Sequence, residues 1–105
     1  MAQNKGVQLI HPIRIDAAST NITTAAWLEV VATLDDDIAF IQITNNAADD
    51  FKLGVGAAGV EDDYIYVSKS SSIEKEVNIS KDLRLSARSI GANITTGTVI
   101  INLWG

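Results

Sequence analysis

A chain of 105 residues has room for one domain of ordinary size and not for two. Its hydrophobic content of 47% is typical of an ordered globular protein, and a net charge of -5 with scattered Lys and Arg residues argues against nucleic-acid binding. Cysteine is absent, which excludes disulfides and thiolate metal sites.

The N-terminal part predicts a polar arm followed by a strand. Residues 1–6 are polar and are expected to form an arm on a single domain that spans residues 1–105. No signal-peptide core follows and no apolar run approaches the ~20 residues that span a bilayer, so we expect no export signal and no membrane partner. Residues 7–16 alternate between apolar and polar side chains, and Pro12 predicts that this strand is bulged or lies at a sheet edge.

A second strand is expected over residues 22–34, although the segment around Ala25 and Ala26 would also suit a helix. The flanking Thr residues and the paired Val residues favour the strand. Its alternation puts Val30 on one face with Leu28, and Trp27 and Val31 on the other face.

Four further strands are expected at residues 38–44, 51–55, 64–67 and 73–79, with polar turns between them. The first of these is apolar on both faces, whereas the second alternates cleanly. Residues 56–63 are rich in glycine and acidic side chains and are expected to form a loop.

The last part of the chain predicts an antiparallel pair. Residues 81–90 and 98–104 both alternate, and a Gly, Asn and Thr turn at residues 91–97 separates them. The final strand carries apolar side chains on both faces, with Ile100 and Trp104 opposite its other apolar residues. This pattern indicates a central strand, or one that a partner covers.

About eight short strands without a convincing helix predict an all-β fold, an antiparallel β-sandwich of jelly-roll type. The expected core consists of the inward apolar residues Leu28, Val30, Ile41, Ile43, Leu53, Val55, Val77, Ile79, Leu83, Leu85, Val99, Ile101 and Leu103.

Two groups of residues could support metal or catalytic chemistry. The acidic runs at residues 35–37, 49–50 and 61–63 offer oxygen ligands to a hard cation, but they lack the alternating spacing of a calcium loop and are typical of solvated turns. His11 is the one histidine, and the sequence offers no marked nucleophile for it, so we interpret it as a structural or rim residue. We therefore expect no catalytic residue and no metal ligand.

Residues 54–59 match the glycine spacing of a dinucleotide-binding motif. That motif requires a following helix whose N-terminus meets the pyrophosphate. Because an acidic segment and a strand follow instead, we interpret these residues as a turn or bulge and expect no cofactor. The chain is predicted not to be an enzyme.

Five aromatic residues are candidate anchors for a partner: Trp27, Phe40, Tyr64, Tyr66 and Trp104. We expect one exposed interface patch that consists of Trp27, Val31, Ile100 and Trp104, provided that their two strands are neighbours in a sheet. The alternative is that these side chains fill both sides of a flattened barrel.

Residues 21–24 and 93–96 both read Asn-Ile-Thr-Thr, and each stands before a strand that contains Trp. We interpret both as Asn turns that lead into β-branched strand starts.

Four segments of the chain resemble segments of known proteins: residues 22–27 (Ile-Thr-Thr-Ala-Ala-Trp), the glycine-rich segment 48–59, the strand at 81–87 and the terminal segment 95–105. With these segments the chain resembles small structural proteins of tailed bacteriophages over most of its length beyond residue 12. The resemblance implies a virion component that is assembled in the host cytoplasm, and it implies no catalytic residue.

Within the virion, the resemblance implies a head decoration (cement) protein that binds the major capsid protein, or a tail- or fibre-associated protein. Because a capsid repeats one subunit around symmetry axes, we expect a homo-oligomer, in particular a trimer. The competing class is a metal- or carbohydrate-binding β module.

Overall fold

The computed structural model describes Gln8, residues 12–57 and residues 60–105. The predicted arm at residues 1–6 and His11 lie outside the described residues. Within the described part there are eight strands, and no helix there is long and apolar enough to cross a membrane. The strands are β1 (Ile13–Asp16), β2 (Leu28–Val31), β3 (Ile38–Asn45), β4 (Phe51–Ala57), β5 (Val60–Val67), β6 (Ser71–Ile79), β7 (Arg84–Ser89) and β8 (Thr98–Trp104).

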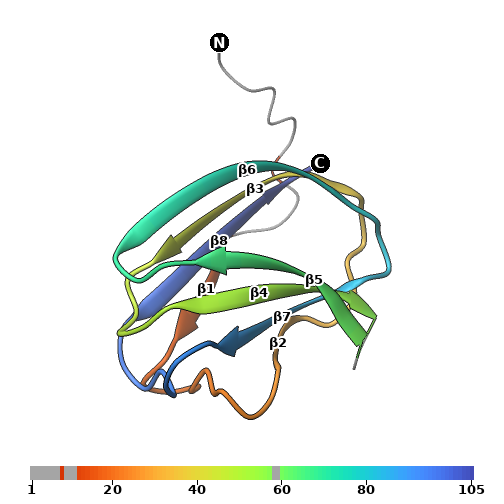
Figure 1. Ribbon diagram of the computed structural model, residues 1–105. Coiled ribbons are helices and arrows are strands. Elements are labelled where there is room, and N and C mark those ends of the chain that lie inside the picture. The colour runs from red at the N-terminus through yellow and green to blue at the C-terminus, as the bar shows by residue number, and fades with distance from the viewer. Residues whose placement is uncertain (1–7, 9–11, 58–59) are drawn as a thin grey trace.

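The strands form two four-stranded sheets with the orders β1-β8-β3-β6 and β2-β7-β4-β5, and all pairings are antiparallel. Figure 1 shows the sheets as two layers that face each other. The pairs β1·β8, β2·β7, β3·β6 and β4·β5 nest inside one another, as in a long hairpin that has been rolled up. This is jelly-roll topology, so the predicted antiparallel sandwich is confirmed.

The core lies between the sheets and follows from the period-two alternation of the strands. In β8 every second side chain is fully buried, and Ile101 lies opposite the fully buried Ile43 of β3. In β4 the fully buried Phe51 and Leu53 face the same interior. Burial of one such side chain stabilises the fold by about 1.5–3 kcal/mol.

The expected core is confirmed. Its buried members are Ile41, Ile43, Leu53, Val55, Ile79, Leu85, Val99, Ile101 and Leu103, and its half-buried members, packed against them, are Leu28, Val30, Val77 and Leu83.

The predicted pairing of the last two strands is wrong. β7 and β8 belong to different sheets, because the segment between them crosses the open end of the sandwich. Ile94 in this segment forms an isolated bridge with Ile22, and both side chains are fully buried. Of the two alternatives for the last strand, a central position or a partner's cover, the structure shows the central position, since β8 lies between β1 and β3.

Each sheet has two edge strands. β1 is one of them, as Pro12 predicts, and β2 is its counterpart in the other sheet. On the opposite side the edges are β5 and β6. The expected loop at residues 56–63 is wrong for the most part, because β4 and β5 form a hairpin in which Ala57 pairs with Val60.

Candidate binding surface

Three aromatic side chains and two cations gather on the outer face of the β2-β7-β4-β5 sheet. We call Trp27, Lys52, Tyr64, Tyr66 and Arg88 the aromatic cluster. The rings of Trp27 and Tyr64 are stacked, with centroids 5.6 Å apart and planes inclined by 10°. Tyr66 meets Tyr64 edge to face at 6.3 Å between centroids. Tyr64 and Tyr66 keep 42% and 64% of their surface exposed, so the cluster is open to a partner.

The alternation of β5 produces the exposed pair of tyrosines. Ile65 and Val67 are buried in the core, so Tyr64 and Tyr66 between them point outward. The register places Tyr64 beside Gly54 of β4, and Gly54 beside Ser86 of β7. Because both of these neighbours are small, the stacked rings have room to cross β4 and β7.

Trp27 stands at the end of a loop that hydrogen bonds hold to the β7–β8 connection. Ile22 and Ile94 exchange backbone hydrogen bonds of 3.0 and 2.7 Å between nitrogen and oxygen. The backbone nitrogen of Thr24 donates to Oδ1 of Asn93 over 3.0 Å. The two Asn-Ile-Thr-Thr segments therefore pair with each other, which is more than the separate turns that the sequence suggests.

Both cations of the aromatic cluster lie against its rings. Nζ of Lys52 is 4.6 Å from the centroid of Tyr64 and 5.5 Å from that of Trp27. The guanidinium carbon of Arg88 is 5.8 Å from the Trp27 ring, and its Nε donates to the carbonyl of Thr24 over 2.8 Å. Such contacts contribute about 0.5–1 kcal/mol each at an exposed site.

Val31 does not lie on the outer face, so its predicted place in an exposed patch is wrong. A bulge between Glu29 and Val31 shifts the alternation of β2 by one residue. Val31 consequently pairs with the fully buried Leu85 and packs against the core. A single inserted residue of this kind leaves no clear mark in the sequence.

Ile100 and Trp104 lie on β8, in the sheet opposite Trp27. The condition for one patch, neighbouring strands, is not met, so the expectation that these residues join Trp27 is wrong. Trp104 is half-buried and meets the buried Phe40 edge to face at 5.6 Å between centroids. Of the four predicted residues, only Trp27 belongs to the aromatic cluster.

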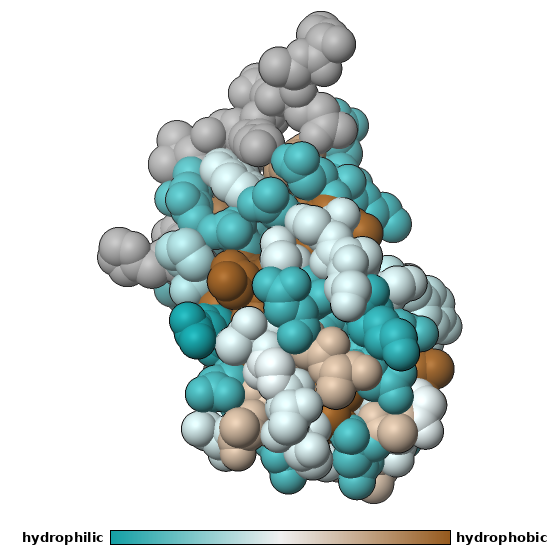
Figure 2. All heavy atoms as spheres, turned by 90° about the vertical axis from the view of Figure 1, so that its left-hand side faces the viewer, coloured by the Kyte–Doolittle hydropathy of each residue, from teal (hydrophilic) through white to brown (hydrophobic). Residues whose placement is uncertain are grey.

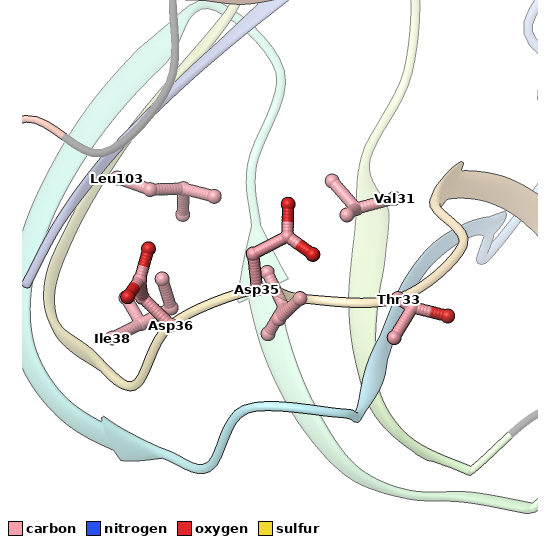
Figure 3. A pocket seen from close by; sticks show the side chains of 7 residues that line it. Val31, Thr33, Asp35, Asp36, Ile38 and Leu103 are labelled. Carbon is pink, nitrogen blue, oxygen red and sulfur yellow. The ribbon is translucent and has the colours of Figure 1, made fainter.

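A small cavity opens at one end of the sandwich, beside the β2–β3 connection (Figure 3). Val31, Ile38 and Leu103 contribute its apolar wall, and Asp35 and Asp36 stand at it with their carboxylates. Its volume of about 80 Å³ is well below the roughly 300–1,000 Å³ of ordinary ligand sites.

Two of the acidic runs, at residues 35–37 and 49–50, hold neighbouring turns by accepting backbone hydrogen bonds. Oδ1 of Asp37 accepts the backbone N–H of Lys81, and Oδ1 of Asp50 accepts that of Lys69, both at 2.8 Å. Among the described residues no three acidic or histidine side chains meet as metal ligands would. The predicted dinucleotide-like segment begins inside β4, as a strand, and residues 58–59 of it lie outside the description.

A wider, shallow groove of about 530 Å³ runs between the edge strands β5 and β6. Val55, Ile65 and Val77 contribute apolar surface to it, and Lys75 and Glu76 contribute charge. Figure 2 shows the molecule from one end of the sandwich. On this face the brown apolar groups of the described residues are scattered among hydrophilic and neutral residues and form no continuous apolar patch.

No protein-family model matches this chain, and no curated protein matches it either. The aromatic cluster is thus the feature on which a function has to be argued. Its three aromatic residues are among the anchors that the sequence predicts, whereas Lys52 and Arg88 are not. The sequence gives little indication that these two cations belong to the cluster. Only the register of β7, β4 and β5 shows that Arg88, Lys52 and Tyr66 stand side by side.

Proposed function

We propose that this chain is a non-enzymatic structural protein of a virion: a capsid decoration (cement) protein that stabilises the head shell by binding the major capsid protein. The aromatic cluster supports the binding role. Trp, Tyr and Arg are the residue types that dominate binding energy at protein interfaces. The resemblance of residues 22–27, 48–59, 81–87 and 95–105 to phage structural proteins supports the virion setting.

The cluster is arranged for binding before a partner arrives. Trp27 and Tyr64 hold each other by stacking, and Lys52 lies over both rings. Side chains that are already ordered lose less entropy on association, at about 0.5–1.5 kcal/mol for each one that need not be immobilised. A sheet face with a preformed aromatic centre suits a protein surface as its partner.

The same geometry weighs against a carbohydrate-binding module. A sugar ring would stack on an open aromatic face, but Trp27 and Tyr64 each use one ring face on the other and Lys52 lies over both, which leaves Tyr66 as the most open ring. A metal-binding module is tested by the melting temperature, which would rise with millimolar calcium if the folded state bound the ion.

The proposal includes a homotrimer on the shell. A decoration protein that matches a symmetry axis of the capsid repeats one contact several times, and linked contacts multiply in strength. Size-exclusion chromatography with light scattering tests this part. A strict monomer, both at high micromolar concentration and when bound to shells, would contradict it.

The role is tested with virus particles that lack this protein. The purified protein is added to these particles, and the particles are then imaged. We expect density on the head shell with the wild-type protein and with Ile90→Ser, which alters an exposed residue 48% accessible to solvent. Tyr66→Ser should weaken binding by about 30-fold or more, the effect of a residue that contributes about 2 kcal/mol. Density on the tail would assign the runner-up role, and density nowhere would refute both.

A further inference from the structure

The aromatic cluster places positive charge on an acidic protein. The chain has a formal net charge of -5, yet Lys52, Arg84 and Arg88 all stand on the outer face of the β2-β7-β4-β5 sheet. Arg84 forms an ion pair with Glu29 at 3.5 Å between nitrogen and oxygen. Lys52 and Arg88 have no carboxylate within ion-pair distance among the side chains that the structure describes.

We propose that the partner of the aromatic cluster is an acidic protein surface, which presents Asp or Glu carboxylates beside apolar side chains to Lys52 and Arg88. The inference rests on the proposed function in one respect, namely that the partner is a protein. It goes further in that it specifies the chemistry of the partner's surface.

The geometry of the two cations supports carboxylates as their partners. Rings beneath the Lys52 ammonium replace part of its water shell, so an approaching carboxylate has less water to displace. Arg88 is held by the bond from its Nε to Thr24, and a guanidinium has further N–H groups in a fixed planar fork. A carboxylate that meets this fork can accept two parallel hydrogen bonds.

The remaining charge of the chain adds orientation. An acidic partner is repelled by a molecule of net charge -5 unless it approaches the face that carries the cations. Complementary charges of this kind raise the rate of productive encounters and suppress wrong orientations. The apolar rings then supply contact area at the centre of the interface.

A partner-independent experiment uses a displayed library of random 12-residue peptides, selected on the immobilised protein. The test variant is the double change Lys52→Glu and Arg88→Glu. Its matched control is Lys69→Glu and Lys81→Glu, at two exposed loop positions, because both double variants carry the same net charge. Circular dichroism checks that each variant folds. If the test variant does not fold, Lys52→Gln with Arg88→Gln replaces it, and Lys69→Gln with Lys81→Gln becomes the matched control.

We expect the wild type and the control to select peptides enriched in Asp and Glu next to apolar residues. For the best peptide, the affinity of the test variant should fall by about tenfold or more, and the affinity of the wild type should fall as salt is raised. Selected peptides without acidic enrichment, or an equal loss in the control, would overturn the inference. Cluster-dependent binding of polygalacturonate without any selected peptide would also overturn it, in favour of an acidic polysaccharide.

The same variants on purified head shells separate the two proposals. Acidic peptides selected through the cluster, without binding to shells, would refute the decoration role and keep the inference. Shell binding that is insensitive to salt and to the Lys52 and Arg88 changes would keep the decoration role and refute the inference.

Discussion

Two single residues fix the geometry around the β3–β4 turn: Asn45 bonds within it, and Gly97 of the β7–β8 connection packs against it. Asn45 is fully buried, and its side chain bonds to three backbone groups, at Ala47, Asp49 and Val67. Gly97 has a positive φ of 91°, and it passes so close to this turn that a Cβ there would stand 2.5 Å from the Cα of Ala47. A fully satisfied buried amide and a glycine in close contact together fix one geometry for the turn.

Gly97→Ala should destabilise the protein by about 2 kcal/mol or more. A Cβ on Gly97 would stand 2.5 Å from the Cα of Ala47, and the positive φ disfavours any side chain. Gly91→Ala is the matched control, because the nearest atom to its Cβ would be 3.8 Å away. Urea unfolding measures both, and equal stabilities would contradict the close approach of the two segments.

Asn45→Ala should lower the free energy of unfolding by about 2–4 kcal/mol, since it leaves several buried backbone groups without their hydrogen-bond partner. Asn46→Ala changes the exposed neighbour and should stay within about 0.5 kcal/mol of the wild type. Comparable losses in the two variants would show that the buried amide is not the cause.

At the scale of elements, the sequence predicts the strands better than their partners. The alternation that predicts the inward residues of β4 and β8 is local, so it can be read directly. The pairing of β7 with β2 and β4 joins residues far apart in the chain, and the tight-looking turn at residues 91–97 suggested the wrong neighbour. The sequence does not predict the bulge at Val30 either, and because of this bulge Val31 faces the interior and not the surface.

In the candidate site, too, local features could be predicted from the sequence and long-range contacts could not. Tyr64 and Tyr66 could be predicted as outward, because they alternate with Ile65 and Val67. Their meeting with Trp27 could not, because it depends on the loop that Asn93 ties down from the other end of the chain. The sequence also cannot show that Ile100 and Trp104 lie in the opposite sheet from Trp27, because alternation carries no information on sheet order.

Asn93→Ala should loosen the loop that carries Trp27 while leaving the sheets intact. The change removes two contacts to Thr24, one to its backbone nitrogen and one to its hydroxyl. Hydrogen exchange should become faster over residues 22–27, with little change in β3 or β8. Unchanged protection there would show that the pairing of the two Asn-Ile-Thr-Thr segments does not depend on Asn93.

At the scale of the whole molecule, β8 joins β1 to the rest of the β1-β8-β3-β6 sheet. It lies between β1 and β3, and Ile101 pairs with Ile13 on one side and Ile43 on the other. Because every partner strand comes from a distant part of the chain, the sheet has no stable subset of neighbours in sequence. Such topologies fold as one cooperative unit, on a scale of roughly milliseconds to seconds.

A fragment that ends at Gly97 should therefore show no cooperative thermal transition. A synthetic peptide of residues 98–105, added in excess, should restore the transition, since it can occupy the vacant place between β1 and β3. The same peptide with Ile101→Ser should fail, because it places a hydroxyl in a fully buried position. A cooperative transition in the fragment alone would contradict the central role of β8.

The charges on the edge strand β6 affect how closely packed copies of this protein can interact. Glu74, Lys75 and Glu76 follow one another along it, all exposed, and none of the described strands pairs with its outer side. A strand from another molecule that tried to extend this sheet would have to strip water from charges on both of its faces. Copies packed closely together, as on any regular array, can thus touch through their chosen faces without fusing their sheets into aggregates.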